Sequence, residues 1–127
     1  AAAERLGHDY HVGLTMSADS FYAGQGREGF EGFEAAGSET LVEDLQNANV
    51  MNIEMEAAAI LTLANVYGLR AGAICSVFAN RETGEFMTEG ESVAAETASL
   101  AVKLLARMDE VKSEAGADRW HAGLSLE

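Results

Sequence analysis

Strand-like and helix-like apolar segments alternate over residues 50–80, and this alternation restricts the chain to few folds. VMNIEM, residues 50–55, is typical of a short buried strand, and EAAAILTLANVYG has the composition of a helix that ends at Gly68. LRAGAICSVFAN, residues 69–80, favours a second, fully buried strand. A helix that joins two strands of one sheet makes a right-handed crossover, so the strands are expected to be parallel. The pattern predicts an α/β fold of three layers, αβα, with a mostly parallel central sheet.

The remaining segments fit the same architecture. AAAERLG is expected to be the end of a helix that Gly7 stops, and because it has no start signal we expect the chain to begin inside an element. The other predicted elements are a strand over 10–19, a glycine-rich loop over 20–37, a helix over 38–49 and a long helix that runs from the Thr88–Glu91 capping box to about Lys112. Ser38, or a capping box of Thr40 with Glu43, is expected to start the first of these helices, and Thr88 with Glu91 the second. The helix over 56–68 is apolar on nearly every side, which predicts that it is packed on most sides.

The charge balance excludes two kinds of partner. The 127 residues carry a formal net charge of −13, and Lys103 and Lys112 are the two lysines. Nucleic acids and anionic membrane surfaces both attract clustered cations, so neither is an expected partner. The acidity fits either a well-solvated cytoplasmic protein or adaptation to high salt, where screening tolerates dense surface carboxylates.

Length and cysteine usage describe a single globular unit. A chain of 127 residues predicts one domain, although the length also suits half of a larger one. The single cysteine, Cys75, excludes an internal disulfide and is expected to be a small buried hydrophobe. The sequence has neither an apolar run long enough to span a membrane nor a secretion signal, so a cytoplasmic protein is expected.

Polar side chains follow the predicted strands at the ends where ligands bind in α/β sheets. Three loops leave those carboxyl ends: one after Asp19, one at the Glu54–Met55–Glu56 junction and one after Asn80. Each loop carries charged or amide side chains, and their convergence predicts a site. His8 and His11 lack a third ligand nearby, so no metal site is expected.

The glycines of FYAGQGREGF match the G-x-G-x-x-G pattern of dinucleotide-binding loops. That function needs a helix directly after the third glycine, and EGFEGFEAAG is a poor helix start, so a cofactor loop is not expected. The side chains between the glycines are better suited to a flat heterocycle, because Gln25 offers an amide and Arg27 a planar fork of donors. An ordinary solvated surface loop is the alternative.

The acidic pair around Met55 has two interpretations. Glu56 stands where a strand turns into a helix, and a carboxylate there can simply complement the helix dipole. An ionised carboxylate also accepts two hydroxyl hydrogens, as a ribose cis-diol would donate them.

Three segments together resemble the second half of the uridine phosphorylases, within the nucleoside phosphorylase family: FYAGQGR, VMNIEMEAAA and GLRAGAICSVFANR. The similarity covers nearly the whole chain. The Glu54–Met55–Glu56 junction is shared widely in the family, whereas the Q-x-R loop points to pyrimidine nucleosides. Purine-specific relatives are expected to have an aspartate after the later strand, where this chain has Ala79-Asn80-Arg81.

The resemblance implies roles on the base side of a nucleoside. Gln25 and Arg27 would pair with the O2, N3 and O4 edge of uracil, and Phe21 would pack on the nucleoside. Arg81 would belong to a mobile lid that closes over the base.

On the sugar side, the resemblance implies that Glu56 binds the ribose 2′- and 3′-hydroxyls. Met55 would line the sugar, with Glu54 nearby. The implied catalytic residues are Arg27, Glu56 and Arg81.

The implied reaction is phosphorolysis of uridine to uracil and ribose 1-phosphate. Inorganic phosphate would be the co-substrate, with no metal or organic cofactor, and the family's homo-oligomers, usually hexamers, would be the assembly. The family binds phosphate in its first half, and Arg5, Arg27 and the histidines make no such cradle. Residues 1–127 are therefore expected to be the C-terminal portion of one domain, inactive without the phosphate-binding half. A nucleosidase that uses water, and a non-catalytic acidic interaction module, stay open as alternatives.

Overall fold

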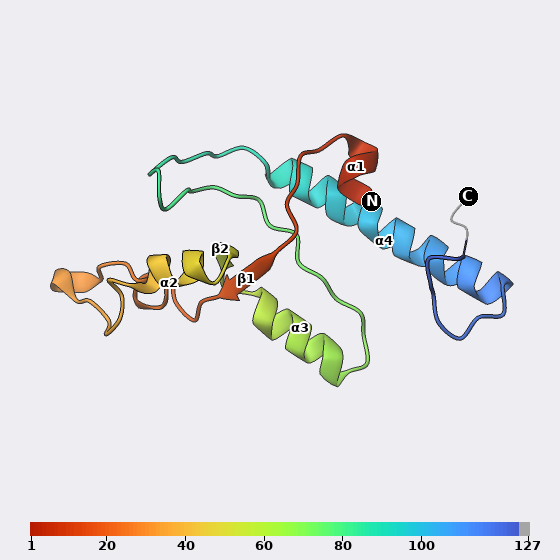
Figure 1. Ribbon diagram of the computed structural model, residues 1–127, viewed down its shortest axis with the longest axis horizontal. Coiled ribbons are helices and arrows are strands. Elements are labelled where there is room, and N and C mark those ends of the chain that lie inside the picture. Colours follow the sequence, from red (N-terminus) through yellow and green to blue (C-terminus); the bar gives the residue numbers. More distant parts are fainter. Residues whose placement is uncertain (125–127) are drawn as a thin grey trace. The chain divides into compact units, whose positions relative to one another are not determined.

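The computed structural model describes residues 1–124, which form two compact units (Figure 1). One unit consists of residues 1–10 together with the described residues from 89 on, and the other of residues 11–88. The last three residues of the expected 1–127 domain lie outside the described residues.

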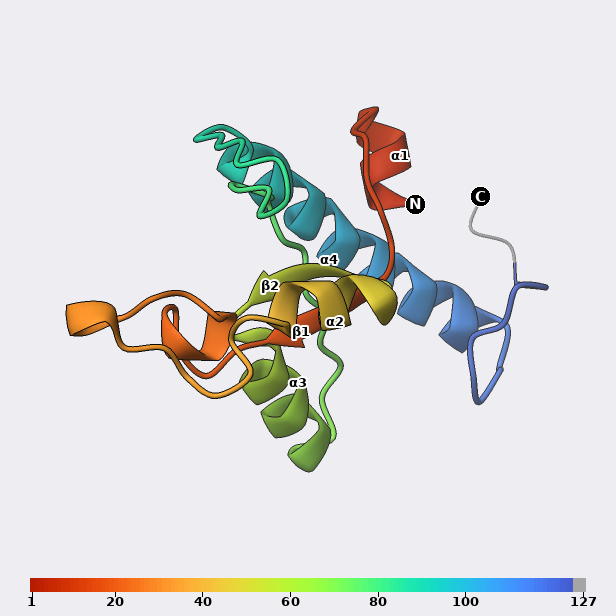
Figure 2. The same ribbon diagram turned by 60° about the vertical axis from the view of Figure 1, so that its left-hand side comes forward.

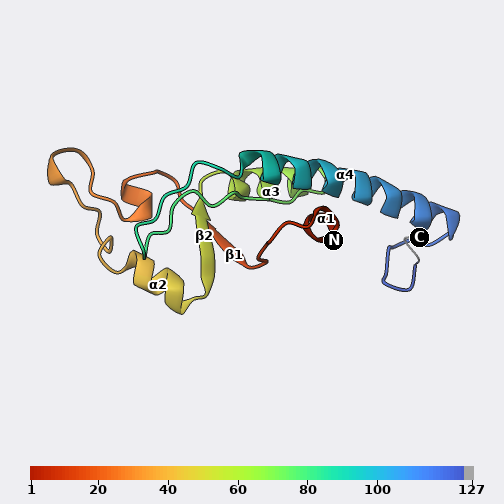
Figure 3. The same ribbon diagram turned by 90° about the horizontal axis from the view of Figure 1, so that it is seen from above.

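A parallel pair of strands is the centre of the unit over 11–88. Strand β1, Leu14–Ser17, lies beside β2, Val50–Glu54, and Ser17 is the register partner of Glu54 (Figure 3). Helix α2, Leu41–Asn47, packs against β2, and helix α3, Ala57–Val66, follows β2 directly. The predicted α/β class with a parallel sheet is confirmed, although β1 is shorter than the predicted strand over 10–19.

The expected strand over 69–80 is wrong. In residues 69–80 the structure has one isolated antiparallel bridge, from Ala79 to Phe86, which closes a turn over 80–85. Cys75 is exposed, which also corrects its expected burial. An apolar run indicates a preference for burial, but a strand forms only where a second strand offers its backbone groups. Neither of the two described strands pairs with this segment.

Helix α3 is also more exposed than expected. Its side chains at Ile60, Leu63 and Val66 are 54–70% exposed. The prediction of packing on most sides is therefore wrong for the described residues, because no other element of residues 11–88 covers these faces of α3.

Both predicted capping boxes are wrong as well. Thr40 directly precedes α2, but its backbone is already helical and its hydroxyl donates to the carbonyl of Gly37 at 3.5 Å. A capping side chain needs a non-helical backbone that turns it toward the first turn. Helix α4, Glu91–Glu114, begins after Gly90, so Thr88 lies too early to cap it.

The other unit pairs two helices. Helix α1, Ala2–Leu6, ends at Gly7 in the left-handed conformation, with φ 71°, as predicted. It packs on α4, where Ala3 and Thr97 are buried, and His8 Nε2 lies 3.5 Å from a carboxylate oxygen of Glu96. Figure 2 shows the two helices of this unit from another side. None of the described helices has both the length and the apolar character needed to cross a membrane.

Candidate active site

One pocket in the unit over 11–88 contains almost all of the predicted site residues. Its volume is about 900 Å³, and it is bounded by β2, part of α2, the loop after β1 and the segment over 74–82. The predicted residues that line it are Phe21, Gln25, Arg27, Glu54, Glu56 and Arg81. Met55 lies between the two glutamates, 40% exposed, and does not line the pocket. All three loops identified at the carboxyl ends of predicted strands therefore contribute to one concave surface.

A tight turn buries the predicted base-reading amide. The 3-10 helix η1, Ala23–Gln25, ends at Gly26, whose φ of 62° favours glycine. A Cβ at this position would lie 2.8 Å from the carbonyl oxygen of Ser38. Gln25, the last residue of η1, is only 6% exposed, and Arg27, two residues further on, lines the same pocket. No α-helix begins between residues 27 and 40, so the glycine loop is not followed directly by a helix N-terminus.

Arg27 is held by an aromatic ring and retains an unused donor. Its guanidinium carbon lies 4.6 Å from the centroid of the Phe21 ring, a cation–π contact. Phe21 in turn meets Tyr22 edge to face, with 5.2 Å between ring centroids. The Nε of Arg27 is buried and has no hydrogen-bond partner among the described residues. Since a buried donor without a partner is costly, this nitrogen is suited to a ligand acceptor.

Arg81 connects the turn over 80–85 to the glycine loop. Asn80 shapes the turn, because its Oδ1 accepts the N–H groups of Glu82 at 2.9 Å and Thr83 at 3.1 Å. The Arg81 guanidinium donates to the carbonyls of Gln25 and, at 3.5 Å, Gly26.

The two guanidinium groups of the pocket influence each other. Burial lowers the pKa of Arg81, and the positive charge of Arg27 lowers it further. Arginine stays charged at any pH of interest, so the pocket contains two cations, Arg27 and Arg81. Its lining also includes the carboxylates of Glu54, Glu56 and Glu82. The two guanidinium groups are the ones that can interact with negative charge on a ligand.

Glu54, which also lines the pocket, caps α3. Its Oε2 accepts the backbone N–H groups of Glu56 at 2.8 Å and Ala57 at 2.6 Å, and its Oε1 accepts the hydroxyl hydrogen of Ser17. Burial raises the pKa of Glu54, but the hydrogen bonds from Ser17, Ala57 and Glu56 outweigh it, so the net pKa lies below the ordinary value. Glu54 is therefore an ionised structural group at the N-terminus of α3.

The carboxylate of Glu56 accepts fewer hydrogen bonds than that of Glu54. Within the described residues its carboxylate accepts the N–H of Met55 at 3.2 Å, and its side chain is exposed at the pocket rim. Of the two acids, Glu56 is thus the one whose oxygens are available to a ligand's hydroxyl groups.

Replacement of Glu54 by glutamine should cost about 1 kcal/mol of stability at neutral pH, because the amide lacks the charge that the α3 N-terminus attracts. Since the folded-state pKa of Glu54 is lowered, its ionised form stabilises the fold above the ordinary carboxyl pKa of about 4.3. That stabilisation is lost as the pH falls through the lowered value. The free energies of unfolding in urea of the wild type and of Glu54→Gln should therefore become equal as the pH is lowered. A difference that stays constant with pH would contradict the capping role.

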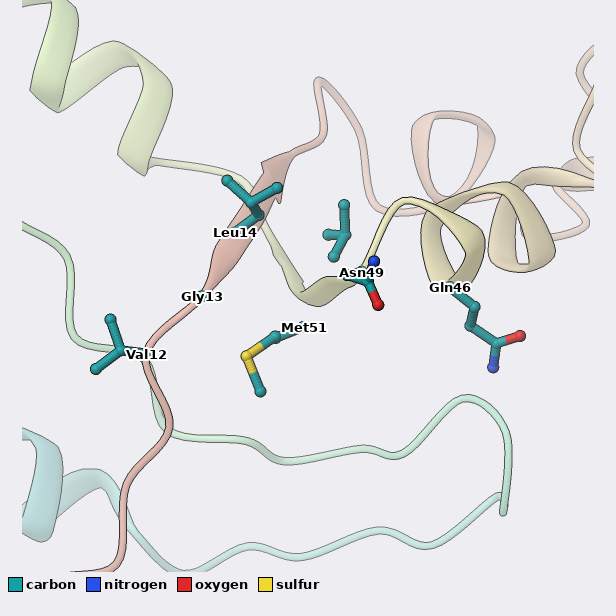
Figure 4. Close-up of a pocket in the computed structure, with 7 residues that line it drawn as sticks. Val12, Gly13, Leu14, Gln46, Asn49 and Met51 are labelled. Atoms are coloured by element: carbon teal, nitrogen blue, oxygen red, sulfur yellow. The ribbon is translucent and has the colours of Figure 1, made fainter.

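A second hollow, of about 570 Å³, lies at the amino ends of the strands (Figure 4). Its lining includes Leu14 of β1, Met51 of β2 and Gln46 of α2, and none of its lining residues is charged. It contains no predicted site residue. Within residues 1–124, no group of three or more His, Cys, Asp or Glu side chains is arranged to hold a metal ion.

Comparison with known proteins places this arrangement in a family. The chain is 57% identical, over 97% of its length, to a uridine phosphorylase of Thermococcus kodakarensis, and 39% identical, over 82%, to one of Klebsiella aerogenes. It is 41% identical, over 65%, to a guanosine phosphorylase of Halorubrum lacusprofundi. The chain covers 44%, 41% and 29% of these three relatives, so it spans less than half of their length. No solved structure matches it.

The similarity is not confined to the pocket. The sequence model described as Phosphorylase superfamily matches residues 1–107, which include the glycine loop, both strands, the acidic junction and most of α4. The chain therefore belongs to the phosphorylase superfamily.

Proposed function

We propose that the protein cleaves uridine-type nucleosides by phosphorolysis, giving the free base and ribose 1-phosphate. The observation that carries the proposal is the pocket that Gln25, Arg27 and Glu56 line together. An amide and a guanidinium suit a base with carbonyl and N–H edges, and a carboxylate suits a sugar diol. The names of the most similar relatives support the same reaction.

The proposed chemistry needs charge stabilisation more than covalent catalysis. Glycosyl transfer passes through an oxocarbenium-like state, in which the sugar becomes positive while the departing pyrimidine becomes negative. The donors of Gln25 and Arg27 interact more strongly with that anion than with the neutral base, and this difference lowers the barrier. Glu56 would hold the ribose through its hydroxyls, and Arg81 would keep the turn over 80–85 against the glycine loop.

A pyrimidine base is favoured over a purine. The Gln25–Gly26–Arg27 loop suits the uracil edge, and the turn after residue 79 offers Asn80, whose Oδ1 is occupied by two backbone N–H groups. It has no aspartate at the place where purine-specific relatives are expected to have one.

The phosphate would bind outside the described pocket residues. From the resemblance we propose that this chain corresponds to the C-terminal portion of a three-layer domain, and its coverage of 44% and 41% of two relatives supports a larger domain. The phosphate-binding half would supply that anion site, and no metal or organic cofactor would be needed. From the resemblance we also propose a homo-oligomer; a native mass equal to one chain would contradict it.

The test is phosphate dependence. The complete native protein should release uracil from uridine only when inorganic phosphate is present, with ribose 1-phosphate as the second product, and guanosine should be a poor substrate. The 127-residue chain by itself should show no turnover. Equal uracil release without phosphate would identify a nucleosidase instead, and no release under either condition, with uridine unbound, would favour a non-catalytic module.

A further inference from the structure

We infer that Ser17 is a positioning residue for the sugar site: its hydroxyl takes over helix capping, so that the Glu56 carboxylate remains available to a ligand. The inference rests on the proposed function, because the ligand groups concerned are the ribose hydroxyls that Glu56 is proposed to bind. Ser17 does not line the pocket and would act through Glu54 and α3.

The parallel register brings Ser17 to this place. Ser17 and Glu54 are partners at the carboxyl ends of β1 and β2, so both side chains reach the N-terminus of α3. The Ser17 hydroxyl donates its hydrogen to Glu54 Oε1 and accepts the N–H of Ala58 at 2.9 Å. Both hydrogen-bonding functions of this one hydroxyl are thus used at the junction.

The capping arrangement at α3 is unusual. Glu56 is the N-cap residue, a position from which a polar side chain ordinarily accepts the N–H of the second or third helical residue. Here the second helical residue is Ala58, and its N–H goes to Ser17. The N–H groups of Glu56 and Ala57 go to Glu54. Glu56 makes no side-chain cap bond to α3, and its carboxylate faces the pocket rim instead.

Removal of the Ser17 hydroxyl changes which groups accept the N–H groups at the N-terminus of α3. The N–H of Ala58 would lose its acceptor at the positive end of the helix, and an N-cap carboxylate is the group best placed to replace it. Glu56 would then turn back to cap its own helix and withdraw from the sugar. Glu54 would keep its two backbone donors but lose the hydroxyl that orients it.

The inference is tested by Ser17→Ala and Ser17→Thr in the complete native protein, with uridine and free uracil as the ligands. Ser17→Ala should weaken uridine binding about tenfold, as loss of a charge-assisted hydrogen bond does, and should leave uracil affinity within about twofold of the wild type. Ser17→Thr retains a hydroxyl and should restore uridine binding. Ser99→Ala removes an exposed hydroxyl that donates to the Ala95 carbonyl of α4, and should change neither affinity.

Two results would overturn the inference. Equal weakening of uridine and uracil would mean that Ser17 supports the whole pocket, and no weakening of either would mean that it positions nothing. A crystal structure of the Ser17→Ala protein adds a readout without ligand, in which a Glu56 oxygen should lie within hydrogen-bond distance of the Ala58 nitrogen. If the wild type binds no uridine, the proposed function fails, and this crystal structure still decides whether Ser17 holds Glu56 away from α3.

Discussion

Glu56→Ala should lower kcat/KM for uridine by about a hundredfold and leave the affinity for free uracil nearly unchanged. The carboxylate would accept two hydrogen bonds from the ribose, and each hydrogen bond to a charged group contributes about 1.5–3 kcal/mol. Uracil has no sugar, so its binding depends on Gln25 and Arg27 alone. Steady-state kinetics with uridine, beside uracil titration by calorimetry, measures both effects in the complete native protein.

Two controls separate this effect from loss of charge or of stability. Glu43→Ala removes an exposed carboxylate of α2 outside the pocket and should leave the kinetics unchanged. Glu56→Gln retains the shape but not the charge, and should fall between the wild type and Glu56→Ala. Equal kcat/KM for Glu56→Ala and the wild type would exclude Glu56 from the sugar site.

Arg27→Ala should reduce kcat for uridine by about 10²–10³-fold, the range observed when one donor to a developing anion is removed. The side chain is preorganised over Phe21 and has a buried Nε without a partner among the described residues, so it needs little rearrangement to meet a negative base. Arg27→Lys should rescue little, because an ammonium lacks the planar fork of donors.

Whether Arg27 acts by stabilising negative charge on the departing base can be tested by changing the acidity of that base. 5-Fluorouracil is a stronger acid than uracil, so its anion needs less stabilisation, and Arg27→Ala should lose less activity on 5-fluorouridine than on uridine. Arg119→Ala removes an exposed arginine that is not among the residues lining the pocket, and it is the matched control. An equal loss on both nucleosides would show that Arg27 binds the base without stabilising its charge.

Local rules predicted those elements whose determinants lie within a few residues. The stop of α1 at Gly7, the strand β2 and the helix α3 follow from a single glycine or a short apolar run. The segment over 69–80 shows the limit, because its apolar run is as strong as that of β2 and yet has no neighbouring strand among the described residues. Strand formation depends on a pairing strand. When that strand is distant in sequence, the residues of the apolar run do not show whether it exists.

The site residues were recognisable from their chemistry, but their interactions were not. Gln25, Arg27 and Glu56 stand out as an amide, a guanidinium and an acid at strand ends, and the structure gathers them into one pocket. Ser17 gave no such signal, since a serine at the end of a strand is common. Its importance depends on the register that sets it opposite Glu54, and register is a property of two strands together.

Glu54 and Glu56 show the same limit on a smaller scale. In the sequence they are two acids around Met55, and spacing leaves Glu56 with two possible roles, complementing the helix dipole or binding a ligand. The structure distinguishes them, because Glu54 is bound to two backbone N–H groups and a hydroxyl, while Glu56 is exposed at the pocket. Which acid caps and which remains available depends on the hydrogen-bond partners, which spacing alone does not determine.

The central claim is that one nucleoside binds in this pocket, with its base at Gln25 and Arg27 and its sugar at Glu56. A crystal structure of the complete native protein with uridine bound tests it most directly. The account predicts the O2, N3 and O4 edge of uracil within hydrogen-bond distance of Gln25 and Arg27. In the same complex the ribose 2′- and 3′-hydroxyls should donate to Glu56. Uridine bound in the opposite orientation, or away from Gln25, Arg27 and Glu56, would contradict it.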